Sequence, residues 1–580
     1  MLICNNMKKI FLLILTAVAL ISSCHKPEYV PPTVERQGIT SLTAFFTSTS
    51  EQFEDKELAK LTVTDPDADR YVIPIPYYFP EESTNPTTLH MTRVRVKAEL
   101  APNCKIYPPL QILDLTQENE FTFTNAQGES RKIIITGSRN KSNKCNLVTF
   151  SLMNPYLVEG FINEETKEIY IFTVDDLSSF SASATACAHA TVETNLVSKK
   201  NYNNEQSVTV VAQDGKTKCT YKILKKHPTK IPFGFREKSV RRLFNMDAIS
   251  RLNFPAYSDE HIFPSLGYIG GHLVVSMGNG SAPIYIDALT GVKLGSIEVG
   301  DAPTDAITSD EGGNLLLTNH AAPTEVLNIY RTKSVSQAPE FFHSFTNETD
   351  VAVGYHVKVH GNIDTDAVIT LTHEGIEGVT GTSKYTRVIV SGGQVVATET
   401  IDLSPLGIGW ANPPGHCAKV VSVSSDIEKG IMVSYYTPYS GTDIRNSLKY
   451  VDGNGSIAAT LPIFEIGSDA QSNYNSNVMD AKTFNNATYA VHLVTSWFAN
   501  WSCGPQLRVF DISSPASIKN GNTVLMDQDI QIDAPGSYDS GYSSGDVIMA
   551  PSADGFKVYV FYFDHNSAVI GGYVADCIDI

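Results

Sequence analysis

The residues best suited to chemistry are aromatic side chains set among small polar residues in the last third of the chain. All three Trp residues lie beyond residue 400. A flat aromatic ring can cover the apolar C–H face of a sugar, while amide, carboxylate and guanidinium groups bond its hydroxyl edge. The pattern predicts a carbohydrate-binding site. Its candidate residues are Trp410, Trp497, Trp501, Tyr436, Tyr474, Asp443, Arg445 and Asn500.

Signatures of catalysis are scarce. The run His373-Glu374-Gly375-Ile376-Glu377 lacks the second His of a zinc-binding HExxH helix, and no nucleophile elbow, phosphate loop or EF-hand spacing occurs. A glycosidase needs only two carboxylates at a suitable separation, but the sequence does not single out a pair among 62 Asp and Glu residues. We therefore expect no catalytic residue, no metal and no cofactor, with a hydrolase or lyase as the alternative.

The amino-acid composition argues against two classes of protein, disordered proteins and nucleic-acid-binding proteins. The chain has 580 residues, of which 42% are hydrophobic, so it can bury a large core and is not disordered. The formal net charge is -18, and a nucleic-acid-binding protein needs a basic surface, so we expect no nucleic-acid partner.

The N-terminus is typical of an export signal. Lys8 and Lys9 precede the apolar run Ile10 to Ile21, which is too short to span a bilayer comfortably. The following Ser22-Ser23-Cys24 resembles a bacterial lipobox, so we expect residues 1–23 to be removed, Cys24 to carry the lipid and residues 24–37 to form a tether. Removal of two Lys and no acid would change the net charge from -18 to -20. An ordinary signal peptide with a chance Cys is the alternative, and no second apolar stretch is long enough for a membrane helix.

Nine Cys residues occur, and seven lie beyond the signal and its lipobox. None of them forms a CxxC pair, and their number is odd. Export permits disulfides, but this spacing predicts neither a disulfide framework nor a zinc site. We expect mostly buried free thiols.

The elements that must position these residues are strands, because apolar residues alternate with a period of two along nearly the whole chain. The hairpin signals around Gly128 and Gly215 predict two immunoglobulin-like β-sandwich modules, 38–140 and 141–226. Unrelated hairpins are the alternative. The basic, Pro-containing segment 227–239 is predicted to be a linker.

Residues 240–580 contain a second repeat, in which a strand, a turn, an apolar strand and a further strand recur six times. This predicts an all-β chain ending in a β-propeller with six blades, closed by the segment Val240 to Ile249 as the last blade's fourth strand. Seven or eight blades, or another β array, are the alternatives. In a propeller the loops that hold the aromatic candidates open on one face, although these rings could also be packing at the blade ends.

The lipobox at Cys24, the paired β units with their NAQG and AQDG hairpins and the propeller-like second half resemble lipoproteins of gut Bacteroidetes that carry N-terminal domains of unknown function. The resemblance implies a non-catalytic surface glycan-binding protein of the starch-utilisation type. It implies anchoring in the outer membrane by lipid alone, a polysaccharide or oligosaccharide ligand and a possible transporter partner. A periplasmic orientation and a structural or protein-interaction role are the alternatives.

Overall fold

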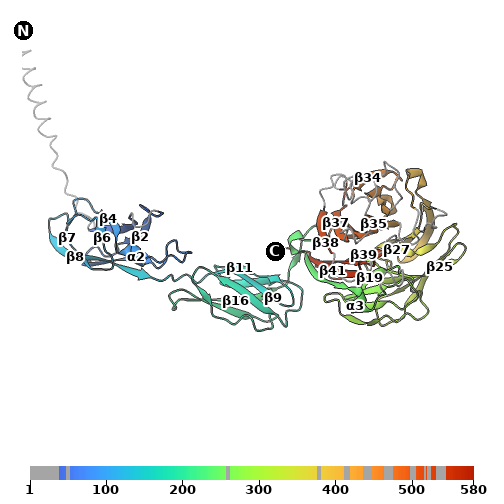
Figure 1. Cartoon of the computed structure of the whole chain (residues 1–580), viewed down its shortest axis with the longest axis horizontal. Helices are drawn as coiled ribbons and strands as arrows, with labels where there is room; N and C mark the ends of the chain where they lie inside the picture. Colours follow the sequence, from blue (N-terminus) through green and yellow to red (C-terminus); the bar gives the residue numbers. More distant parts are fainter. Residues whose placement is uncertain are drawn as a thin grey trace, which may run out of the picture. The chain divides into compact units, whose positions relative to one another are not determined.

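The structure is a computed structural model that describes residues 38–47, 52–255, 262–374, 381–410, 418–435, 447–462, 474–496, 505–514, 518, 524–530 and 544–579. The chain divides into two compact units, residues 1–226 and 227–580, which are described separately (Figure 1). Both units consist almost entirely of strands, so the predicted all-β class is confirmed. The N-terminal 37 residues, with the signal and Cys24, lie outside the described part.

The first module of the N-terminal unit has two sheets packed around one apolar core. One sheet has the order β2 (Glu57–Thr62), β1 (Ile39–Phe45), β4 (Val94–Leu100), β6 (Ile112–Leu113), and the other β3 (Arg70–Pro76), β8 (Ser130–Asn140), β7 (Asn119–Thr124), β5 (Lys105–Tyr107). Alternate residues of β3, namely Tyr71, Ile73 and Ile75, are buried, as the period of two requires.

The second module repeats this plan. One sheet has the order β10 (Val158–Glu159), β9 (Leu147–Met153), β13 (Ser181–Ala186), and the other β11 (Phe161–Asn163), β12 (Glu168–Phe172), β16 (Lys218–Lys226), β15 (Gln206–Val211), β14 (Thr191–Val192). The predicted hairpins are β7–β8 and β15–β16, both antiparallel. Each module also has one parallel pair, β3 with β8 and β12 with β16.

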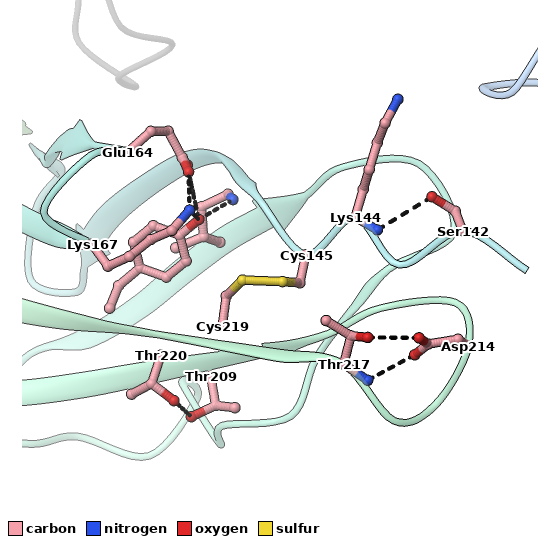
Figure 2. The surroundings of a disulfide bond; sticks show 12 residues. Ser142, Lys144, Cys145, Glu164, Lys167, Thr209, Asp214, Thr217, Cys219 and Thr220 are labelled. Atoms are coloured by element: carbon pink, nitrogen blue, oxygen red, sulfur yellow. Dashed lines mark hydrogen bonds and ion pairs between the residues drawn. A yellow bond between two sulfur atoms is a disulfide. The ribbon is translucent and has the colours of Figure 1, made fainter. Parts of the chain in front are cut away.

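The expectation of mostly free thiols needs a correction, because Cys145 and Cys219 form a disulfide across the second module (Figure 2). Their Cα atoms lie 5.6 Å apart although 74 residues separate them in the chain. Sequence spacing could not reveal this pair, since only the packing of the two sheets brings the start of β9 next to β16. Cys104, Cys187 and Cys577 are free.

The C-terminal unit is propeller-like. Its described residues form six antiparallel sheets of four strands. Each of the first five sheets takes four consecutive strands. The first sheet consists of β19 (Ser265–Ile269), β20 (His272–Ser276), β21 (Ile284–Asp287) and β22 (Lys293–Ser296), and the second of β23 (Ala306–Ser309), β24 (Leu315–Thr318), β25 (Val326–Thr332) and β26 (Glu340–Thr346). The third sheet consists of β27 (Val353–Gly361), β28 (Ala367–His373), β29 (Lys384–Ser391) and β30 (Gln394–Asp402), the fourth of β31 (Ala418–Ser422), β32 (Ile431–Tyr435), β33 (Ser447–Val451) and β34 (Ile457–Pro462), and the fifth of β35 (Tyr474–Phe484), β36 (Ala487–Ser496), β37 (Gln506–Asp511) and β38 (Val524–Asp529).

The sixth sheet joins the two ends of this unit. It consists of β39 (Gly545–Pro551), β40 (Lys557–Asp564), β41 (Val569–Asp576) and β18 (Arg241–Asp247), which pairs with β41 as expected for the segment Val240 to Ile249. A short second pair, β17 (Thr229–Lys230) with β42 (Ile578–Asp579), lies beside it. The first strands of successive sheets contact one another, and β39 contacts β19, so the strands close a ring.

Apolar packing holds the sheets together at every junction. The buried clusters lie between the first and second sheets, the second and third, and so on, and the last lies between the sixth and the first. Strands β28, β32 and β40 are buried along their whole length because each has a neighbouring sheet on both faces. No helix in the described ranges is long and apolar enough to cross a membrane.

Candidate ligand-binding face

The predicted sugar site falls mostly outside the described residues. Trp497, Trp501, Tyr436, Asp443, Arg445 and Asn500 are not described, and Tyr474 begins β35 but its side chain is not described. Trp410 is the candidate whose side chain is placed. The environment of the Trp410 side chain is therefore described first.

Trp410 lies in the core. It is 2% exposed and packs with Tyr385 and Ile408 between the third and fourth sheets. Its indole N–H donates to the backbone carbonyl of His373 at 2.9 Å. As placed, the ring has no open face on which a sugar could stack, and its role is packing at the end of a sheet.

The same face carries another group of aromatic and charged residues, here called the rim cluster: Phe263, Tyr355, His320 and Glu374. Phe263 lies just before the first strand β19, and Tyr355 lies near the start of the first strand β27. Glu374 directly follows the second strand β28, and His320 lies two residues beyond the end of the second strand β24. In antiparallel sheets these four positions lie at the same end. The topology therefore brings together residues from three sheets.

Three rings of the rim cluster stack in a row. Phe263 and Tyr355 have ring centroids 4.4 Å apart at an interplanar angle of 18°. The imidazole of His320 also stacks on Tyr355, with ring centroids 4.3 Å apart at 25°. Stacking against two rings therefore fixes the orientation of the Tyr355 ring and of its hydroxyl.

A glycine permits this stack. Gly354 has φ +128°, and a Cβ at this position would lie 2.2 Å from the carbonyl oxygen of Asn319. No other residue type fits so close to the loop that carries His320. The Thr318 hydroxyl also donates to the carbonyl of Gly354 at 3.1 Å, which fixes β27 against the end of β24.

Glu374 supplies a carboxylate with one oxygen unused. Its Oε2 lies 3.2 Å from His320 Nε2, while its buried Oε1 has no hydrogen-bond partner among the described residues. The side chain is only 5% exposed, whereas that of His320 is 30% exposed. The backbone N–H of His320 donates to Asp305 Oδ2 at 2.8 Å. A buried acceptor without a donor is costly, so this oxygen is suited to receive an N–H or O–H group from a ligand or water.

Electrostatics keep the rim cluster polar near neutral pH. Burial by itself would lower the pKa of His320, but the hydrogen bond and charge of Glu374 outweigh burial and raise it. Burial raises the pKa of Tyr355 to about 12, so its hydroxyl stays protonated and can donate. The cluster can thus offer an imidazole, a hydroxyl donor and a carboxylate acceptor to one ligand.

The neighbouring His373 has a different role. It is buried between Thr349 and Thr386, whose hydroxyl oxygens lie 3.0 Å and 2.8 Å from its ring nitrogens. Burial lowers its pKa to about 4, so the ring is neutral. Consecutive residues at a strand end project to opposite sides, which separates this structural His from Glu374.

Beneath the face, charged side chains fill the middle of the ring of first strands. This central cluster contains three Lys and two Asp, all 3% exposed or less: Lys358, Lys419, Lys482, Asp480 and Asp546. Lys358 in the third sheet donates to the Val547 carbonyl in the sixth sheet at 2.8 Å. Bonds between sheets that are not neighbours place the cluster at the centre.

Three of the four carboxylate oxygens of the central cluster have close partners, while Asp480 Oδ1 lies 3.8 Å from Lys482 Nζ and has no hydrogen bond among the described residues. Asp546 Oδ1 lies 2.9 Å from Lys358 Nζ and 3.3 Å from Lys419 Nζ, and its Oδ2 accepts the N–H of Leu266 at 2.9 Å. Asp480 Oδ2 likewise accepts the N–H of Met549 at 3.0 Å. Each Asp therefore binds the backbone of the next sheet, which gives the pair a structural role. Within the described ranges, no group of His, Cys, Asp and Glu could hold a metal ion.

Sequence reasoning missed His320 and Tyr355 and considered Glu374 only as part of a failed zinc motif. A usable signal existed, because all three lie in the loop types that the repeat assigns to one face. The predicted sugar site was chosen from the positions of the Trp residues. The sequence alone does not show that His320, rather than another His, lies beside Glu374.

Comparison with solved structures finds distant likenesses. A DUF4623 family protein from Bacteroides eggerthii is 14% identical, with 74% of this chain and 98% of that chain covered and a TM-score of 0.41. A PQQ-bound aldose sugar dehydrogenase from Streptomyces coelicolor is 14% identical, with 59% and 100% covered and a TM-score of 0.29. A streptogramin B lyase is 10% identical, with 58% and 98% covered and a TM-score of 0.29. No activity follows from likenesses at this level, and no curated protein matches the sequence significantly.

Family profiles match nearly the whole chain. Residues 19–137 match a domain of unknown function, DUF5018, and residues 147–225 match another, DUF8499. Residues 242–576, more than half of the chain and nearly all of the propeller-like unit, match a third domain of unknown function, DUF8500. The chain therefore belongs to the DUF8500 family.

Proposed function

We propose that this protein is a non-catalytic, lipid-anchored glycan-binding protein of the outer membrane, which captures polysaccharide at the cell surface for an uptake system. Lipidation at Cys24 would tether the chain, and the propeller-like unit would bind the ligand. A transporter complex in the same membrane would be its protein partner.

We further propose a finer architecture of two immunoglobulin-like modules followed by a six-bladed β-propeller. Support comes from the two-sheet plan that both modules share and from the apolar clusters at all six sheet junctions, including the junction of the sixth sheet with the first. Such a ring presents one face of loops to a ligand, and the two modules would serve as spacers from the membrane.

The observation that carries the proposal is the rim cluster. It combines stacked rings with a carboxylate oxygen that lacks a partner, on the same face to which the repeat assigns Trp497 and Trp501. Carbohydrate sites need aromatic surface and a few placed polar groups, and both are present.

Affinity electrophoresis of the full chain against a panel of polysaccharides tests the proposal. We expect at least one glycan to retard the protein, and His320→Ala, Glu374→Gln, Trp497→Ala and Trp501→Ala to reduce the retardation. His343→Ala on β26 and Glu428→Gln, an exposed residue in the turn between β31 and β32 at the opposite end of the sheets, serve as controls and should migrate like the unmodified protein. Failure of every glycan to retard the protein would overturn the proposal.

One observation favours a second candidate, a glycan hydrolase or lyase. His320 with a raised pKa beside a carboxylate is an arrangement suited to proton transfer. Release of labelled product from a bound glycan, abolished by His320→Ala, would support catalysis. Binding with no product over long incubation would leave capture as the function.

A further inference from the structure

A pocket lies in the N-terminal unit, far along the sequence from the rim cluster. It has a volume of about 670 Å³ and is lined by the end of β3 with the residues after it, by the segment that joins the two modules and by the turn between β15 and β16. Pockets of about 300 to 1,000 Å³ are the usual size for small ligands. We call it the joint pocket.

Polar contacts and ring stacking hold the two modules together beside this pocket. The Glu81 carboxylate accepts hydrogen bonds from Lys144 Nζ at 2.5 Å and from the Ser142 hydroxyl at 2.8 Å. His189 of the second module lies 2.9 Å from the Glu81 carbonyl through Nε2, and its ring stacks on Tyr78 at 4.3 Å. The walls of the pocket are therefore fixed by polar contacts and by stacking.

Positive charge dominates the lining. Four cations, Arg139, Lys141, Lys144 and Lys216, face two acids, Glu81 and Asp214. Both acids are already engaged. Glu81 pairs with Lys144, whose hydrogen bond lowers the pKa of Glu81, and Asp214 accepts bonds from Thr217 Oγ1 and from the N–H groups of Lys216 and Thr217.

The four cations outnumber the two acids. Arg139 and Lys141 form no ion pair among the residues that the structure describes, and the charge of Lys216 acts on Asp214, which the Thr217 hydroxyl and two backbone N–H groups already engage. This local excess occurs in a chain with a net charge of -18, so it is not a consequence of overall composition. An anionic group would neutralise it.

Arg139 is set in place before any ligand arrives. Its guanidinium carbon lies 3.4 Å from the ring centroid of Tyr77, and its Nε donates to the Tyr77 carbonyl at 3.3 Å. Its Nη1 also donates to the Thr88 hydroxyl. A guanidinium fixed in this way still has the N–H groups of Nη2 for a carboxylate or sulfate, and it loses little entropy when it binds one. Tyr77 and Tyr78 add aromatic surface to the same wall.

We propose that the joint pocket binds an acidic saccharide, a sugar chain bearing carboxylate or sulfate groups. The cations would hold the anionic groups and the tyrosines would contact the sugar rings, in a volume larger than a lone inorganic ion needs. This second site does not depend on the function proposed for the propeller-like unit, where the rim cluster is lined by Glu374 and Asp305 and suits a neutral ligand.

Isothermal titration of the full chain tests the proposal with trigalacturonate as the probe and maltotriose as a neutral trisaccharide of matched length. We expect trigalacturonate to bind, maltotriose not to bind, and the affinity to fall as NaCl is raised from about 0.05 M to about 0.5 M. The double variant Lys141→Ala/Lys216→Ala should weaken binding at least about tenfold, since it removes two of the four cations.

The control is Lys105→Ala/Lys199→Ala, which removes the same charge from exposed positions outside the pocket. It should retain the affinity of the unmodified chain, as should His320→Ala, which separates this site from the rim cluster. No binding of trigalacturonate, equal losses in both double variants, or equal binding of maltotriose would overturn the proposal. Inorganic sulfate binding as tightly as trigalacturonate would also overturn it, because the sugar would then contribute nothing.

Discussion

The central cluster and the rim cluster both bury carboxylates in the propeller-like unit, but they use them differently. In the central cluster, Asp546 pairs with two Lys and also accepts the N–H of Leu266 in the neighbouring sheet. In the rim cluster, Glu374 pairs with one partly exposed His and keeps Oε1 without a partner. The first arrangement holds sheets together, and the second leaves a bonding position open.

The comparison shows that burial and charge alone do not mark a functional site. The charges of the central cluster are buried more completely, and burial lowers the pKa of Lys419 to about 8. Even so, its carboxylates bind the backbone of the next sheet. An oxygen without a hydrogen-bond partner is not sufficient either, because Asp480 Oδ1 in the central cluster also lacks one. The better indicator is such an oxygen beside partly exposed rings, as at Glu374 in the rim cluster.

The largest expected effect is on the central cluster. Asp546→Ala should lower the free energy of unfolding of the propeller-like unit by about 3–5 kcal/mol, because two buried ammonium groups lose their counter-ion. Denaturant unfolding of the full chain measures it. The exposed Asp301→Ala is the control, and a loss no larger than the control's would show that Asp546 does not hold the sheets.

The next effect concerns Trp410, which lies beneath the face. Trp410→Phe should cost about 1–3 kcal/mol of unfolding free energy, because the buried His373 carbonyl loses its indole donor. Glycan retardation should not change. Weaker retardation of a fully folded Trp410→Phe variant by a glycan would show that Trp410 contributes to ligand binding.

Glu374→Gln should show the reverse pattern. The free energy of unfolding should change by less than about 1 kcal/mol, because Oε1 has no bond to lose and the His320 contact is partly exposed. Glycan affinity should fall about tenfold, which corresponds to about 1.4 kcal/mol. Strong destabilisation of the Glu374→Gln variant would show that Glu374, like Asp546, holds the sheets together and does not serve ligand binding.

The smallest effect is a pH dependence of the rim cluster. The folded-state pKa of His320 is raised, so its contribution to stability is fully present below its unfolded pKa of about 6.5 and is lost as pH rises through the folded pKa. The contribution should be below about 1 kcal/mol because the pair is partly exposed. NMR of ¹³C-labelled histidine, with His320→Gln for assignment, should show a titration above that of free His that shifts downward in Glu374→Gln. An unchanged pKa of His320 in the Glu374→Gln variant would show that the two side chains do not interact.

Much of the fold was predictable because strands are a local property. The alternation of Tyr71, Ile73 and Ile75 and the hairpin signals around Gly128 and Gly215 follow from backbone geometry, and the structure has strands at those positions. The closing strand was also predictable, since the last repeat lacked a partner that Val240 to Ile249 could supply.

The sequence predicted on which face of the propeller-like unit the candidate site lies, but not which residues form it. Repeat topology indicates which loops share one end of the sheets, but it does not tell which side chains from those loops meet. Trp410 shows the limit, because an aromatic at a loop position can equally turn into the junction between two sheets.

The sequence by itself determined the strands, their sixfold repetition and the acidic balance, since each can be read from neighbouring residues or from composition. Tertiary structure decided which distant residues meet. It joins Cys145 to Cys219 across 74 residues, brings Phe263 and Glu374 into one cluster and gathers four cations with two acids at the joint pocket. The physical reason is that such contacts depend on how sheets pack against one another, and packing is a property of the whole core.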